Sequence, residues 1–192
     1  QLVESLVEAA GQLVAERGLD ALTTVRVAER AGVSVGSLYQ YFANKEALLA
    51  ALVARMNREL GEAVNAVAPS LIGGDPNTLV RGLLDTAFAF FGARQGLHME
   101  LLRNWSRLDI ERGLRQFEQQ MLDLIRTYAL QHLRDLRFDP TPAQGFIIIN
   151  SVVFTLLRYL SLPRSALFTR EQLIDELTRM VAGSLAAPPP PG

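Results

Sequence analysis

The chain of 192 residues contains no cysteine, and this absence removes several kinds of chemistry at once. Disulfide bonds, thiolate metal sites and a cysteine nucleophile are all excluded. The composition fits a reducing compartment, and the sequence shows no secretory signal peptide. We therefore expect a cytoplasmic protein.

Histidine is almost as scarce, because His98 and His132 are the only two in the chain. Neither stands at metal-ligand spacing with a carboxylate on the same helical turn. The sequence also lacks a phosphate-binding loop, a Gly-x-Ser-x-Gly nucleophile elbow and a recognisable motif of paired carboxylates. These absences predict a protein that is not an enzyme and that uses neither a metal nor a cofactor.

Net charge is close to zero, at −1, so the chain as a whole does not attract nucleic acid. Residues 1–50 carry four Lys or Arg side chains against six Asp or Glu. If this segment binds DNA, the attraction has to come from helix ends, local geometry and a few cations rather than from a broad basic surface.

Strand patterns and internal repeats are also missing, whereas helical periodicity runs through the chain. Apolar residues make up 49% of the sequence, enough to bury a substantial core. The spacing of these residues predicts an all-α fold of about nine helices. The predicted helices cover roughly residues 2–17, 25–31, 35–41, 45–68, 79–93, 97–108, 110–134, 143–160 and 170–186. Pro69, Gly73, Gly74 and Pro76 are expected to break the chain after the fourth helix.

Residues 23–42 predict the most specific local structure. We expect Thr24 to cap a short helix, because its hydroxyl can accept a hydrogen bond from a free amide of the first turn. The apolar face of that helix begins with Val25, Val27 and Ala28. Gly32 stands where the chain has to reverse, since glycine accepts a positive φ without steric cost. Ser34 then caps a second helix that ends near Tyr41, and such a pair predicts a helix-turn-helix unit.

The same residues resemble the DNA-binding signature of the tetracycline-repressor (TetR) family of bacterial transcriptional regulators. The matching pattern is Ala28-x-x-x-Gly32-Val33-Ser34-x-Gly36-Ser37-Leu38-Tyr39-x-Tyr41-Phe42-x-x-Lys45-Glu46-x-Leu48. The resemblance covers roughly residues 2–55, and beyond them only the succession of helices fits the family.

This resemblance implies an all-α homodimer with a three-helix, helix-turn-helix DNA-binding domain and a larger helical domain for ligand binding and dimerisation. It implies repression through a palindromic operator in double-stranded DNA, relieved when a small molecule binds the C-terminal domain. The corresponding ranges are 1–46 for DNA binding, 47–187 for ligand binding and dimerisation, and 188–192 for a proline-rich tail.

The resemblance also implies which residues touch DNA. The helix after the turn would lie in the major groove, with Gln40 able to hydrogen-bond an adenine edge through two contacts. Thr24, Tyr41 and Lys45 would hold phosphates, helped by the start of the fourth helix near Asn44. The complete candidate set is Thr24, Ser34, Val35, Gly36, Ser37, Tyr39, Gln40, Tyr41 and Lys45.

Aromatic residues of the C-terminal part either line a ligand cavity or pack as ordinary core. The candidate ligand-binding set comprises Phe88, Phe91, Trp105, Phe117, Met121, Tyr128, Asn150 and Phe154. If a cavity exists among them, the expected inducer is a small apolar or aromatic molecule. Asn150, Phe154 and Arg158 are spaced by four residues and share one helix face, and for Arg158 we favour a place at a subunit interface.

The last two helices, 143–160 and 170–186, are predicted to pair with those of a second copy as a four-helix bundle. Their apolar surface would otherwise face water. The run 146–162 is too short and too polar for a membrane span, so we expect no membrane partner.

A second hypothesis stays open beside the repressor. The chain would then be a helical small-molecule-binding protein whose DNA binding is weak or lost. The acidic balance of residues 1–50 and the uncharged Val35 and Gln40 motivate it, because they reduce the attraction for phosphate.

Overall fold

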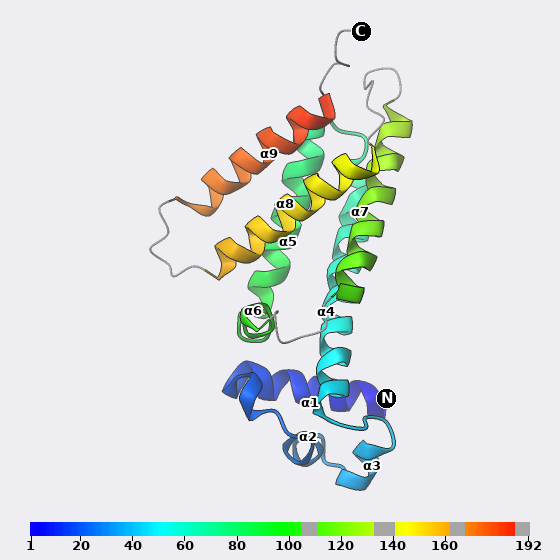
Figure 1. The fold of residues 1–192 in the computed structure, drawn as a ribbon, viewed down its shortest axis with the longest axis vertical. Helices are drawn as coiled ribbons and strands as arrows, with labels where there is room; N and C mark the ends of the chain where they lie inside the picture. The colour runs from blue at the N-terminus through cyan, green and yellow to red at the C-terminus, as the bar shows by residue number, and fades with distance from the viewer. Residues whose placement is uncertain (105–110, 133–140, 162–167, 187–192) are drawn as a thin grey trace. The chain divides into compact units, whose positions relative to one another are not determined.

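The computed structural model describes residues 1–104, 111–132, 141–161 and 168–186 of the chain. Within these ranges the chain is helical and forms no strand, which confirms the predicted all-α class (Figure 1). The helices are α1 Leu2–Arg17, α2 Thr24–Ala31, α3 Val35–Tyr39, α4 Lys45–Leu71, α5 Pro76–Ala93, α6 Gln95–Arg103, α7 Glu111–Gln131, α8 Pro142–Leu160 and α9 Arg170–Ala186. A 3-10 turn, Leu19–Ala21, lies between α1 and α2. The predicted proline-rich tail falls outside the described residues.

Contacts group the chain into two compact units. We call Gln1–Glu59 together with Phe91–Leu114 the N-terminal unit, and Leu60–Phe90 together with Arg115–Gly192 the C-terminal unit. α4 and α5 each contribute residues to both units. The boundary predicted after residue 46 separates a DNA-binding domain from a ligand-binding domain. The two units are defined by contacts and not by function, so this boundary stays a prediction.

Reciprocal hydrogen bonds fix the beginnings of the last two helices. At α8 the Thr141 hydroxyl accepts the Gln144 amide at 3.2 Å, and the Gln144 side-chain oxygen accepts the Thr141 amide at 3.0 Å. Thr169 and Gln172 repeat the arrangement at α9, at 3.2 and 2.8 Å. These capping boxes are the ones that the sequence predicts, because each needs only residues three apart.

The two prolines around the α4–α5 turn behave differently from the prediction. Pro69 does not end α4, which continues to Leu71. Pro76 opens α5, where its missing N–H has no intrahelical partner to lose. Asp75 caps this helix by accepting the Thr78 amide at 3.0 Å, and this backbone hydrogen bond lowers the pKa of Asp75.

The N-terminal unit closes a core around α1. Leu6 of α1, Val27 of α2 and Leu38 of α3 are fully buried in it. Leu97 and Leu101 bring α6 into the same core. α6 approaches α1 so closely at Gly96 that an added Cβ would lie 3.1 Å from the Ala15 carbonyl oxygen.

The C-terminal unit has two clusters of buried residues. One joins α5, α8 and α9 through residues such as Phe88, Leu156 and Ile174. The other joins α4, α7 and α8 through Val64, Met121 and Ile149. These clusters use only part of the surface of α8, because much of this helix is left uncovered by the rest of the chain.

α8 is the one helix among the described residues that is long and apolar enough to cross a membrane. Its mean hydropathy is 1.4, and 17% of the tested window is buried. A single helix of this kind is weak evidence for a membrane span, since length and composition are all that it satisfies.

Candidate nucleic-acid interface

α2 begins one residue away from the predicted position. The cap is Thr23 rather than Thr24, with the Thr23 hydroxyl accepting the Arg26 amide at 3.3 Å. Thr24 is the first residue of the helix. Two consecutive threonines are equally good caps by composition, and only the extended backbone at Thr23, with φ −137° and ψ 150°, decides between them.

The turn between α2 and α3 depends on Gly32. Its φ of 69° and ψ of 31° lie in the left-handed region, as the sequence predicts. The Gly32 amide donates to the Glu29 carbonyl at 3.2 Å, and the Val33 amide donates to the Ala28 carbonyl at 3.0 Å. These bonds satisfy the last carbonyls of α2 and aim the chain toward the next helix.

α3 is a short helix that is held by a cap at its start and by one buried side chain. The Ser34 hydroxyl caps it by accepting the Ser37 amide at 3.0 Å, and the two hydroxyls lie 2.8 Å apart. Leu38 is fully buried and fixes the helix to the core. The helix ends at Tyr39, so Gln40 and Tyr41 lie in the following turn. The prediction that the helix continues to about Tyr41 was wrong.

None of the nine predicted DNA-contacting residues is buried. Six are exposed and three are half-buried. The exposed ones are Ser34, Gly36, Tyr39, Gln40, Tyr41 and Lys45, and the half-buried ones are Thr24, Val35 and Ser37. The hydroxyls of Thr24 and Tyr39 lie 3.2 Å apart, which joins the start of α2 to the end of α3. The structure therefore brings residues from both helices to one place.

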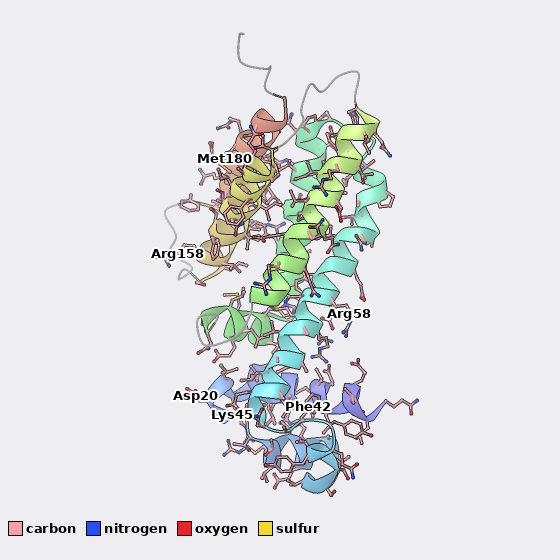
Figure 2. All side chains as sticks on the ribbon, turned by 45° about the vertical axis from the view of Figure 1, so that its right-hand side comes forward. Asp20, Phe42, Lys45, Arg58, Arg158 and Met180 are labelled. Atoms are coloured by element: carbon pink, nitrogen blue, oxygen red, sulfur yellow. The ribbon has the colours of Figure 1, made fainter. Side chains whose placement is uncertain are left out.

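Lys45 is the first residue of α4 and follows the buried Phe42 by three positions; Figure 2 labels both. The Asn44 side chain caps this helix by accepting the Ala47 amide at 2.9 Å, as the sequence predicts. Among the described residues no carboxylate pairs with the Lys45 ammonium. A cation beside the positive end of a helix favours the binding of an anion such as phosphate.

Two arginines of this region are occupied within the protein. Arg30 donates through both terminal nitrogens to the two carboxylate oxygens of Glu16, each at 2.6 Å. This hydrogen-bonded pair lowers the pKa of Glu16 and raises that of Arg30. Arg26 donates to the Ala21 carbonyl at 3.0 Å. The basic groups that the sequence offers near the turn are therefore not equally available to DNA.

The interpretation of Val25 as core was wrong, because 48% of its surface is exposed. Val27 and Ala28 are buried, so the buried face of this eight-residue helix is narrow and Val25 falls outside it. Val25 follows the half-buried Thr24 at the start of α2 and is itself exposed. Stricter use of the three- and four-residue spacing would have separated Val25 from the core positions.

The structure distributes the predicted ligand-binding residues among several settings. Phe88 packs edge-on against Tyr159 in the C-terminal unit, with ring centroids 5.7 Å apart. Phe91 faces His98 in the N-terminal unit at 5.9 Å. Phe117 and Met121 belong to the cluster that also contains Val64 and Ile149. Trp105 lies outside the described residues.

Tyr128 is buried and holds a turn. Its hydroxyl donates to the Gly74 carbonyl at 3.0 Å, and its ring stacks on His132 with centroids 4.3 Å apart. His132 in turn contacts the Ile72 carbonyl at 2.9 Å. Burial, followed by the nearby Asp75 charge, raises the pKa of Tyr128. Its hydroxyl is therefore already engaged in the fold.

Asn150 and Phe154 do come together, along one hollow of about 570 Å³ on α8. The Asn150 amide also donates to the Glu118 carboxylate at 2.7 Å, linking α8 to α7. The complete predicted set stays a prediction as a ligand site. In the described ranges, no group of three or more His, Asp or Glu side chains is arranged to hold a metal ion.

The N-terminal part of the chain is similar to known proteins. Residues 6–52 match the family of bacterial regulatory proteins, tetR family. The chain is 35% identical over 85 residues to the HTH-type transcriptional regulator BetI of Yersinia pestis, covering 44% of this chain and 43% of BetI. It is 39% identical over 66 residues to the nucleoid occlusion factor SlmA of Haemophilus ducreyi, covering 34% of this chain and 31% of SlmA. The chain thus spans less than half the length of these curated relatives.

A likeness in fold extends over the whole chain. A solved TetR-family transcriptional regulator from Haemophilus influenzae superposes with a TM-score of 0.69, covering 97% of each chain. The sequence identity is 18%, so this likeness concerns the fold alone.

Proposed function

We propose that the chain, whose residues 6–52 match the TetR family of bacterial regulatory proteins, is a dimeric repressor of transcription. It would bind a palindromic operator and release it when a small molecule binds. The observation that carries this proposal is the exposed, uncharged face of α3 on a helix that Leu38 anchors to the core. A face of this kind suits entry into the major groove, where hydrogen bonds to base edges read the sequence.

Gly36 supports close approach by DNA. Its φ is not positive, because Gly18 and Gly32 are the glycines with positive φ in the described chain. A Cβ at Gly36 would meet only the Ser34 hydroxyl, at an ordinary contact distance of 3.7 Å. The fold therefore does not need glycine at this position. Close approach by a DNA backbone or base edge would need glycine there, because glycine leaves the most room.

The proposed phosphate contacts surround this face. Tyr41 is 52% exposed and Lys45 has no ion-pair partner among the described residues. Thr24 stands at the start of α2, where backbone amides are available to an anion. Ser37, Tyr39 and Gln40 would then lie nearest the bases.

Dimerisation through α8 and α9 is supported by the surface that α8 leaves uncovered. Phe146 is 60% and Ile147 62% exposed, and neither side chain has a polar atom to bond water. Met180 of α9 is 46% exposed, and Figure 2 labels it. A second copy would bury this surface, and two recognition helices roughly 34 Å apart would read successive major grooves. In keeping with this role we propose a cytoplasmic protein without a membrane partner.

The test is a gel-shift titration with the intergenic DNA upstream of the protein's own gene. Lys45→Ala should weaken binding to every sequence and reduce the slope of log affinity against log salt by about 0.9, since one phosphate contact is lost. Tyr41→Ala should weaken binding as well. Arg126→Ala is the matched control, because this exposed arginine pairs with Asp123 on α7. Unchanged binding in both Tyr41→Ala and Lys45→Ala would remove the proposed contacts.

A second candidate is a helical small-molecule-binding protein with weak or lost DNA binding. The internal pairing of Arg30 with Glu16 and of Arg26 with Ala21 favours it, because both cations are withdrawn from phosphate. Absence of a gel shift even at low salt, together with tight binding of a ligand, would support this candidate against the repressor.

A further inference from the structure

Val25 differs from the residues around it on the surface that holds the proposed DNA contacts, because it is exposed and has no polar atom. Its side chain is 48% exposed in the first turn of α2. Val33 and Val35, which follow in the chain, are partly buried against the core of the N-terminal unit, whereas Val25 does not belong to that cluster. The core of the described N-terminal unit therefore does not account for a valine at this position.

Exposed apolar groups are few in the N-terminal unit. Among its described residues, the exposed large apolar or aromatic side chains are Val3, Val25, Tyr39 and Tyr41. The two tyrosines each carry a hydroxyl that can bond water or DNA, and Val3 lies at the start of α1. A single exposed valine is ordinary on a protein surface, so the position of Val25 has to decide what it contacts.

The direction of Val25 follows from the contacts of its neighbours on α2. Thr24, the preceding residue, has its hydroxyl 3.2 Å from that of Tyr39 at the end of α3. Arg30 pairs with Glu16 of α1. Val25 and Arg30 are five positions apart, or about 140° around a helix of 3.6 residues per turn, so Val25 faces away from α1. It therefore lies on the outer side of α2, beside residues proposed to contact DNA.

We propose that Val25 reads a thymine of the operator, by packing its two methyl groups against the C5-methyl of that base in the major groove. Base edges there offer hydrogen-bond donors and acceptors, and the thymine methyl is their apolar feature. The contact would select thymine over cytosine, which has no methyl at C5. Valine suits it, because a branched side chain in a helix is held in one χ1 rotamer and loses little freedom on binding. The inference rests on the proposed function, since it needs α2 and α3 to approach the groove.

The test compares two DNA fragments of one sequence, the intergenic DNA upstream of the protein's own gene, made with thymine or with uracil throughout. Uracil keeps the hydrogen-bonding groups of thymine and lacks the C5-methyl. In gel-shift titrations, wild type should bind the thymine fragment about fourfold more tightly for each half-site, or about fifteenfold for a dimer. Val25→Ala should bind the two fragments nearly equally, whereas Val25→Ile should keep the preference. Replacing the thymines one at a time then locates the base.

Val3→Ala is the matched control, because it makes the same change at another exposed valine, and it should keep the wild-type ratio of the two affinities. Thermal melts check that every variant is folded. Equal affinities of wild type for the two fragments would overturn the inference and leave the repressor intact.

Two results with Val25→Ala would also overturn the inference. A thymine preference retained in full would assign the methyl contact to other residues, and equal weakening on both fragments would place Val25 against the sugar–phosphate backbone. Failure of wild type to bind the thymine fragment, even at low salt, would overturn the proposed function together with the inference.

Discussion

The two units differ in the chemistry of the large side chains that they expose. The N-terminal unit exposes Tyr39 and Tyr41, at 51% and 52%, and both side chains carry a hydroxyl. The C-terminal unit exposes Phe146 and Ile147 on α8, which have no polar atom. The first surface can bond a polar partner without being buried, whereas the second gains free energy only by being covered. This difference teaches that the polar surface suits the proposed contact with nucleic acid, whereas the apolar surface suits the proposed contact with a second copy.

Buried charge also distinguishes the units. In the N-terminal unit the side chain of Arg55 is 8% exposed and is held by Glu8 at 2.9 Å and Glu59 at 3.7 Å. The ion pairs described in the C-terminal unit join exposed groups, such as Arg170 with Asp85. Ion pairing therefore contributes to the internal packing of the first unit and mainly to the surface of the second.

The largest effect is expected from the core of the N-terminal unit. Leu38→Ala should lower the free energy of unfolding by about 3 kcal/mol, because it removes a fully buried side chain and leaves a cavity. Leu130→Ala on α7 should change it by less than about 0.5 kcal/mol, since Leu130 is 68% exposed. Denaturant unfolding of both variants checks the contrast. Equal losses would mean that burial does not separate these two leucines.

The next effect concerns the uncovered face of α8. Ile147→Glu should weaken self-association by about a hundredfold while leaving the fold intact, because a charge would have to be buried in the interface. Leu130→Glu, another exposed apolar residue, should associate like wild type. Sedimentation velocity over a range of concentrations measures both. If the two variants associate equally well, α8 is not the dimer surface.

Glu8→Gln should destabilise the N-terminal unit by about 1–2 kcal/mol at pH 7, because Arg55 loses its nearest counter-charge but keeps Glu59. Burial raises the pKa of Glu8, but the charges of Arg55 and Arg94 with hydrogen bonds from Gln12 and Arg55 outweigh it, so the pKa is lowered. The stabilisation is therefore present above the ordinary pKa of 4.5 and is lost as the pH falls through the lowered value.

Thermal unfolding as a function of pH checks this linkage. The advantage of wild type over Glu8→Gln should shrink as the pH is lowered below the ordinary glutamate range. Glu4→Gln is the control, because Glu4 and Arg58 are both largely exposed and lie 3.9 Å apart. An advantage that persists at low pH would show that the Glu8 carboxylate does not stabilise through its charge.

The smallest effect compares two tyrosine hydroxyls. Tyr128→Phe should cost about 1 kcal/mol, because it leaves the half-buried Gly74 carbonyl without its partner. Tyr39→Phe should cost less, since water replaces the bond to Thr24 at the exposed end of α3. Denaturant unfolding of the two variants gives the comparison. A larger loss of unfolding free energy for Tyr39→Phe than for Tyr128→Phe would contradict this comparison of a buried with an exposed tyrosine.

Much of the candidate interface could be predicted from the sequence. The turn at Gly32, the cap at Ser34 and the helix start at Asn44 all use hydrogen bonds between residues close in the chain. The family resemblance found in residues 28–48 agrees with the match over residues 6–52. The predicted cap at Thr24 and the predicted helix end at Pro69 were wrong by one or two residues. The sequence rules for caps and helix ends do not distinguish such neighbouring positions.

The predicted ligand set was harder to judge, because its members share only composition. Phe88, Phe91 and Tyr128 are all buried aromatics, yet they pack against different partners. The hollow on α8 depends on Phe168 returning to Tyr159 after α8 has ended, and no spacing rule connects these two rings.

The sequence by itself determined the turn at Gly32 and the caps at Ser34 and Asn44, because each needs only residues up to five positions away. Only the tertiary structure decided which charged and polar groups remain available to partners. Glu16 and Arg30 are 14 residues apart, and Thr24 and Tyr39 are 15 apart, so each pair meets only when the helices pack. The same packing uses Arg30 internally and leaves Lys45 and Arg158 without a carboxylate among the described residues. Availability depends on distance in space, which hydrophobic packing sets and local sequence does not.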